Sequence, residues 1–178
     1  MSDTLAREPL RLVRWTSTSG SNMNSRGAVV IHGAGHDWKA SAEGNGAVDA
    51  LLRAVNLALA DVLGGAPLLL AYDVHALSEG PSAEGRVNVR IAPPLNAKGE
   101  RSDGRFSGEA TSTNIVAASV EAYVAALNSM LAVGPWEGAA EDAVARRGAE
   151  GMADAEASDD EAEYEHGTKI DTTSWFNR

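Results

Sequence analysis

The sequence contains no cysteine, which excludes a disulfide framework, thiol nucleophiles and cysteine metal ligands. Aromatic residues make up only 5% of the 178 residues, while alanine is abundant, so we expect a core packed from small side chains. The longest apolar run, residues 66–72, is too short to span a membrane, and a secretory signal segment is missing. These absences favour a cytoplasmic protein that has no membrane partner.

Motifs for catalysis and cofactor binding are also missing. A Gly-x-Ser-x-Gly elbow, a phosphate-binding loop and a dinucleotide fingerprint do not occur, so we expect no catalytic residue and no cofactor. His32 and His36 flank Gly33-Ala34-Gly35, and their spacing of four suits a metal ion only on a helix. Because the glycines disfavour a helix there, we interpret both histidines as structural and expect no metal site.

Negative charge is concentrated at the C-terminal end. The formal net charge is -10; residues 135–178 hold 12 acidic and 4 basic residues, whereas residues 1–134 hold 13 and 11. The first part lacks a basic stripe, which argues against nucleic-acid binding, and we expect residues 135–178 to be an acidic, disordered tail. A weak helix over residues 141–152 is the alternative. Ile170, Trp175 and Phe176 form either a short docking motif or a segment that packs back on the domain.

The same order of elements occurs twice along the chain. Alternating apolar residues predict strands, and apolar residues three or four positions apart predict helices. The first half is predicted as strands at 10–15, 28–32 and 36–41 and a helix over 47–63, with a polar loop at 17–24 and a turn at 33–35. The second half is predicted as strands at 68–76, 86–91 and 105–111 and a helix that begins after Thr113 or Asn114 and reaches Met130.

The two predicted helices begin in similar sequences. Residues 42–48 align with residues 110–116 without gaps, and the same register places Ala54 opposite Ala122 and Leu59 opposite Leu127. We interpret this as a duplicated βββα unit, at about 8–63 and 64–132, although chance similarity of alanine-rich helices is the alternative. The expected fold is therefore α+β, with two pseudo-symmetric βββα units, helices packed on antiparallel sheet, in a domain over 1–134 followed by the acidic C-terminal tail.

Two segments rich in small residues are candidates for a ligand site. Gly44, Asn45 and Gly46 open the first helix with a bare backbone, and the free amides of a helix N-terminus favour a carboxylate. The plain alternative is a tight loop before a helix. The strand that carries His75 and Ala76 runs into Ala83 and Gly85, which either wall a pocket for a short aliphatic ligand or form a simple hairpin turn.

Three motifs in these segments resemble the C-terminal regulatory domain of 2-isopropylmalate synthase, which citramalate synthases share. They are Gly44-Asn45-Gly46 with residues 48–51, Tyr72 with His75-Ala76-Leu77 and Gly80, and Asn114-Ile115-Val116 with residues 118–119 and 126–128. The resemblance covers about residues 26–131. It implies two βββα units related by a pseudo-twofold, a homodimer, and a site between the units for the feedback inhibitor leucine, or isoleucine in citramalate synthases.

The resemblance also implies which residues touch this amino-acid effector. By matching motifs, the effector's backbone groups lie along Gly44, Asn45, Gly46, Val48 and Asp49. The positions around its side chain come from the second segment and the second helix, namely His75, Ala76, Ala83, Gly85 and Ile115.

Two departures from the family bear on function. Ala42 and Ala47 stand where the family usually has glycine and proline, and the chain has no room for the metal-dependent catalytic barrel. We expect a free-standing, non-catalytic regulatory domain that binds a branched-chain amino acid and acts with a separate synthase chain. The alternative is a dimerisation module that has lost the ligand and recruits a partner through its acidic tail; an enzyme in its own right is the least favoured hypothesis.

Overall fold

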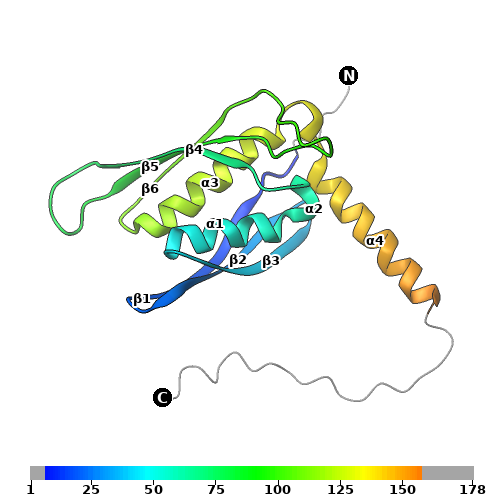
Figure 1. Cartoon of the computed structure of the whole chain (residues 1–178), viewed down its shortest axis with the longest axis horizontal. Coiled ribbons are helices and arrows are strands. Elements are labelled where there is room, and N and C mark those ends of the chain that lie inside the picture. Colours follow the sequence, from blue (N-terminus) through cyan, green and yellow to red (C-terminus); the bar gives the residue numbers. More distant parts are fainter. Residues whose placement is uncertain (1–6, 158–178) are drawn as a thin grey trace, which may run out of the picture. The chain divides into compact units, whose positions relative to one another are not determined.

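The computed structural model describes residues 7–157, which form two three-stranded sheets and the helices between and after them (Figure 1). Contacts divide the chain into one compact unit up to Arg146 and a second from Arg147 onward. The elements are β1 (Arg11–Gly20), β2 (Met23–Gly33), β3 (His36–Gly44), α1 (Ala47–Ala58), α2 (Ala60–Leu63), β4 (Leu68–Ala76), β5 (Gly85–Ala92), β6 (Phe106–Ser112), α3 (Ile115–Leu131), the 3-10 turn η1 (Gly134–Trp136) and α4 (Ala139–Ala157).

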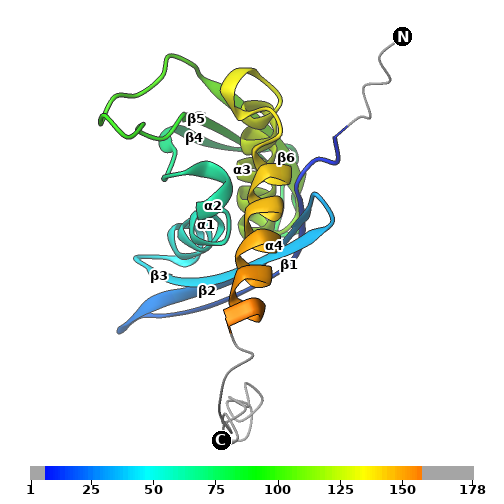
Figure 2. The same cartoon turned by 90° about the vertical axis from the view of Figure 1, so that its right-hand side faces the viewer.

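Each sheet consists of consecutive antiparallel strands, in the order β1-β2-β3 and β4-β5-β6. Helix α1 packs on β2 and β3, and α3 packs on β5 and β6. Figures 1 and 2 show α1 and α3 side by side between the two sheets, where they also contact each other. This is the α+β arrangement that the sequence predicts.

The two halves repeat not only their elements but also their register. In the first sheet Val29 pairs with Ala40, and in the second Val89 pairs with Gly108. The strand that precedes each helix ends at Gly44 in the first half and at Ser112 in the second, and the helices follow at Ala47 and Ile115. These boundaries agree with the gapless alignment of 42–48 with 110–116, so the structure confirms the two βββα units.

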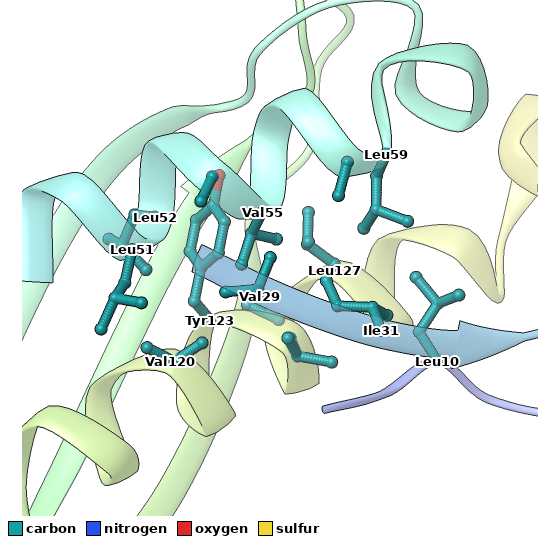
Figure 3. Packing of buried hydrophobic residues seen from close by; sticks show 14 of the residues in the cluster. Leu10, Val29, Ile31, Leu51, Leu52, Val55, Leu59, Val120, Tyr123 and Leu127 are labelled. Carbon is teal, nitrogen blue, oxygen red and sulfur yellow. The ribbon is translucent and has the colours of Figure 1, made fainter. Parts of the chain in front are cut away.

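One continuous apolar core joins the two sheets through the helices. Figure 3 shows side chains from α1, α3, β2 and the segment before β1 meeting in this core. The small side chains Ala54, Ala58, Ala122 and Ala126 are at most 5% exposed and bring helix backbones close to their neighbours. The alanine-rich composition therefore yields close packing of elements rather than a bulky core.

Three predicted boundaries in the first half are wrong. The predicted loop at 17–24 is largely strand, because β1 runs to Gly20 and β2 starts at Met23. This ribbon is polar, so it lacks the alternation that marks a half-buried strand. Strand β3 extends past Ser41 to Gly44, and the predicted helix over 47–63 is interrupted at Leu59 between α1 and α2.

The prediction of disorder from residue 135 is wrong for the helix α4. Alanine, glutamate and arginine are strong helix formers, and Glu141 and Asp142 in the first turn suit the positive end of the helix dipole. Ala143 is fully buried, and Arg146 Nη2 donates to the carbonyl of Asp61 at 2.8 Å. Residues 158–178, including the candidate docking residues, lie outside the described part of the chain.

Length and hydropathy decide whether a helix within residues 7–157 could cross a membrane. No single helix in this part of the chain is long and apolar enough to cross a membrane. The segments 115–131 and 134–150, bent by 103°, meet these criteria only as a pair.

Candidate functional site

The end of β3 makes a close approach to the first turn of α1. A Cβ atom at Gly44 would lie 2.5 Å from Ala50 N and 2.6 Å from Asp49 Oδ2, so this position requires glycine. Gly46 differs, because a Cβ there would meet no atom within 4 Å. The bare backbone at Gly44 therefore faces its own helix, whereas the space at Gly46 is open.

Asp49 holds this turn together from inside the helix. Its Oδ2 accepts a hydrogen bond from Asn45 N at 2.9 Å, and Arg53 Nε donates to Oδ1 at 3.0 Å. The Asn45 amide and, after it, Arg53 lower the pKa of Asp49. The side chain remains 40% exposed. Asp49 thus stays ionised at neutral pH and satisfies the Asn45 amide, while part of its carboxylate still faces solvent.

The starts of α1 and α3 differ in how they are capped. Asn114 precedes α3, and its Oδ1 accepts hydrogen bonds from Val116 N at 3.0 Å and Ala117 N at 3.3 Å. The equivalent residue before α1 is Gly46, which has an extended backbone and provides no side-chain cap. The first turn of α1 therefore keeps amide donors that α3 satisfies with its own asparagine.

The second predicted group gathers at the start of α3. Ala76 pairs with Gly85 across β4 and β5, and a Cβ at Gly85 would lie within 2.0 Å of Ile115 Cδ1. The space left by the glycine is thus filled by Ile115. Ala83 lies in the hairpin, where its N–H donates to Gly80 O at 3.1 Å.

His75 lies apart from this group. It follows Val74, which pairs with the buried Val87, and it pairs with the exposed Arg86. Because successive strand residues point to opposite faces, His75 projects away from the face that carries Ala76.

The two predicted groups occupy the same end of the helix pair, since α1 and α3 both begin at that end in Figure 1. The first group, residues 44–49, lies where β3 meets α1. The second, Ala76, Gly85 and Ile115, lies where β4 and β5 meet α3. A separate hollow of about 350 Å³ lies nearby on the strands before α1 and is lined by Arg26, Ser41, Ala42 and Glu43.

Comparison with known proteins identifies the family to which both repeated units belong. The sequence model of the LeuA allosteric (dimerisation) domain matches residues 1–131. The chain belongs to the LeuA allosteric (dimerisation) domain family. The match ends at the last residue of α3, so it contains both βββα units, and the predicted resemblance is confirmed.

Relatives of this LeuA domain are much longer proteins. The chain is 33% identical over 124 residues to 2-isopropylmalate synthase from Aromatoleum aromaticum, and 36% identical over 126 residues to that from Cupriavidus metallidurans; both alignments cover 70% of this chain and 22% of the relative. The synthase from Aquifex aeolicus is 34% identical over 121 residues, which cover 68% of this chain and 21% of the relative. The chain therefore spans about a fifth of the length of these relatives.

Several polar contacts that shape the LeuA domain were not predicted from the sequence. Tyr72 Oη and Ser119 Oγ lie 2.7 Å apart and join β4 to α3, and Tyr123 donates its hydroxyl to Asn56 Oδ1 at 2.7 Å between the two helices. Ser119 is fully buried. A lone serine on an apolar helix face was the sequence feature that could have indicated a buried hydrogen bond at this position.

The two histidines of the β2–β3 hairpin have separate contacts. His32 Nδ1 lies 2.7 Å from Asp37 Oδ1, and this hydrogen bond lowers the pKa of Asp37. The His36 ring packs edge-on against Trp38, with ring centroids 4.6 Å apart. The hairpin turn between them is formed by Ala34 and Gly35, both with positive φ.

Proposed function

We propose that this chain is the regulatory, homodimeric part of a 2-isopropylmalate synthase system and binds a branched-chain amino acid. The acyl-transfer chemistry belongs to a separate synthase catalytic chain, and the place of action is leucine biosynthesis in the cytoplasm. Membership of the LeuA allosteric domain family supports a regulatory role. No catalytic residue of this chain is part of the proposal.

The observation that carries the ligand proposal is the uncapped start of α1. Amides in the first turn and the positive end of the helix dipole suit the carboxylate of an amino acid. The partly exposed carboxylate of Asp49 suits its ammonium group. Ile115, seated over Gly85 at the same end of the helix pair, offers an apolar wall for a short aliphatic side chain. A zwitterion with a branched alkyl group matches these three features together.

Calorimetry and thermal unfolding of the whole chain with leucine, isoleucine and valine test this proposal. A ligand that binds only the folded state at a hundredfold excess over its Kd adds about 2.7 kcal/mol to the free energy of unfolding. For a chain of this size we expect Tm to rise by about 5–10 °C. Neither heat of binding nor a rise in Tm with any of the three amino acids would contradict the ligand proposal.

A pair of substitutions at Gly46 locates the ligand. The position has an extended backbone with φ -159° and open space around it, so larger residues fit. G46D should cap the first-turn amides as Asn114 does in α3, raise stability by a few tenths of a kcal/mol and abolish binding. G46A leaves the amides free and should still bind. Unchanged affinity in G46D would place the ligand elsewhere.

Gly44 is unsuited to this test, although it belongs to the same predicted group. Any side chain at this position meets the backbone of Ala50 at 2.5 Å. A loss of binding in such a variant would therefore report a displaced helix rather than a blocked ligand.

A second candidate is a dimerisation module without a ligand, which recruits a partner through its acidic tail. The observation that favours it is the internal use of Asp49, which already binds the Asn45 amide and Arg53. The comparison to make is between the full chain and a chain ending at Ala157. Partner loss on truncation, together with no amino-acid binding by the full chain, would favour this second function.

A further inference from the structure

Strand β4 carries an exposed apolar surface that the rest of the fold does not cover. Among the large hydrophobic residues that the structure describes as exposed, six lie within ten positions of one another and are 37–46% exposed. We call them the β4 surface: Leu68, Leu69, Leu70, Tyr72, Val74 and Leu77. Helix α3 packs over β5 and β6, which leaves the β4 side of the sheet open. Apolar patches of this kind mark interaction sites in soluble proteins.

The strand is also a free sheet edge, because β4 ends the order β4-β5-β6. The bond from Leu77 N to Glu84 O, together with the pairing of Ala76 with Gly85, sets which residues bond to β5. In an antiparallel ladder bonded and non-bonded pairs alternate, so Tyr72, Val74 and Ala76 direct their N–H and C=O groups outward. These groups form a ready template for another strand.

The corresponding edge strand of the first sheet is protected against such pairing. Strand β1 has the sequence RLVRWTSTSG, with two arginines and a polar second half, and it has a register irregularity after Leu12 as β4 has after Leu69. Strand β4, LLLAYDVHA, has neither lysine nor proline along its length. Of two strands with the same place in the repeat, β4 has the more apolar edge, in which Asp73 is the one acidic residue.

We propose that β4 pairs antiparallel with β4 of a second copy of this chain, with the two-fold axis at Val74. The inference rests on the proposed homodimer and names the surface that forms it. In this register Val74 lies opposite the partner's Val74, and Tyr72 lies opposite the partner's Ala76. The outward N–H and C=O groups of the two edges then bond to each other, and the exposed side chains of Tyr72 and Val74 from both copies lie together on one face around the axis.

The two polar side chains of β4, Asp73 and His75, favour this register and a second copy as the occupant. With the axis at Val74, Asp73 lies opposite the partner's His75, and the contact occurs twice. Moving the axis by one residue places Asp73 opposite the partner's Asp73, and like charges directly opposite are destabilising. The strand is therefore complementary to itself in one direction and register. The bond between Tyr72 Oη and Ser119 holds one side chain of this surface against α3 before pairing.

Cysteine crosslinking tests the axis, since the chain has no cysteine of its own. In V74C the two new thiols face each other across the axis, at a separation that a disulfide spans after small adjustment, so oxidation should yield a covalent dimer on a non-reducing gel. V13C is the matched control, because Val13 is 56% exposed at the irregularity of β1, the counterpart of the one in β4. It should remain uncrosslinked at the same protein concentration.

Exchanging Asp73 and His75 tests the register without a new thiol. D73H alone places imidazoles opposite each other and should weaken the dimer by about 2- to 30-fold in sedimentation equilibrium, since two cross-strand carboxylate–imidazole pairs are lost. The double variant D73H/H75D restores both pairs and should restore the dimer. Failure of the swap to restore it would overturn the register, even where V74C does not fold.

The outcomes separate this inference from the proposed function. A dimeric wild-type chain with selective crosslinking of V74C supports the β4 interface. A dimeric wild-type chain in which V74C crosslinks no better than V13C overturns the β4 interface and leaves the proposed dimerisation intact. A wild-type chain that stays monomeric throughout the micromolar range overturns both.

Discussion

Replacing Gly108 by alanine is a direct test of how closely β6 packs against α3. A Cβ atom at this position would lie 2.1 Å from Ala122 O and 2.3 Å from Ala126 N. Both are backbone atoms of a buried helix, so no flexible side chain moves aside to make room. The methyl group must therefore push α3 away from the sheet and open the core on which Tyr123 and Leu127 pack.

The expected cost follows from measured overpacking in other cores. Inserting a methyl group into a packed core costs about 1–3 kcal/mol, and contact with helix backbone places G108A near the upper end, at about 3 kcal/mol. This is a large fraction of the 5–15 kcal/mol that separates most folded domains from their unfolded chains. For a chain of this length it corresponds to a fall in Tm of roughly 6–12 °C.

Urea unfolding and thermal unfolding followed by circular dichroism measure this effect. Ser107 provides the control, because it is the exposed neighbour of Gly108 on β6, and S107A should change the free energy of unfolding by less than about 0.5 kcal/mol. A loss below about 1 kcal/mol in G108A would refute the close approach of β6 to α3.

Two further substitutions test polar contacts between distant parts of the chain. N128A removes both the bond from Leu10 N to Asn128 Oδ1 and the bond from Asn128 Nδ2 to Leu10 O, each 2.8 Å, so chemical denaturation should show a loss of about 2 kcal/mol. Burial raises the pKa of Tyr123 from 10.0 to about 12, so the folded state holds this proton more tightly and stability falls from pH 10 to 12; urea midpoints of Y123F should fall less steeply there.

The order of elements follows from the sequence because its signals are local. The boundaries of β4 agree with the prediction, and the alignment of residues 42–48 with 110–116 locates the start of both helices. The β1–β2 ribbon and the interruption of the first helix at Leu59 leave no such signal. Polar residues that pair in an exposed ribbon resemble a loop, and Leu59 is a good helix former that ends α1 only in its tertiary setting.

The candidate site is less accessible to prediction, because small residues indicate space but not what fills it. Gly85 leaves room that Ile115, thirty positions away, occupies, and Gly44 leaves room for the backbone of its own helix. His75 and Ala76 are neighbours in the sequence, but strand alternation directs their side chains to opposite faces of the sheet. The effector role of these residues stays a prediction. Its physical basis is the set of uncapped amides in the first turn of α1.

The exclusive pairing of consecutive strands has a consequence for how the chain assembles. Each half pairs only its own consecutive strands, which favours rapid formation of local structure, while the contacts of Leu10 with Asn128 span 118 positions and form only when both halves meet. A break between Gly64 and Pro67 would leave two peptides, each with three strands and their helix. The two peptides are halves of a divisible fold, held together by side chains rather than by a shared sheet.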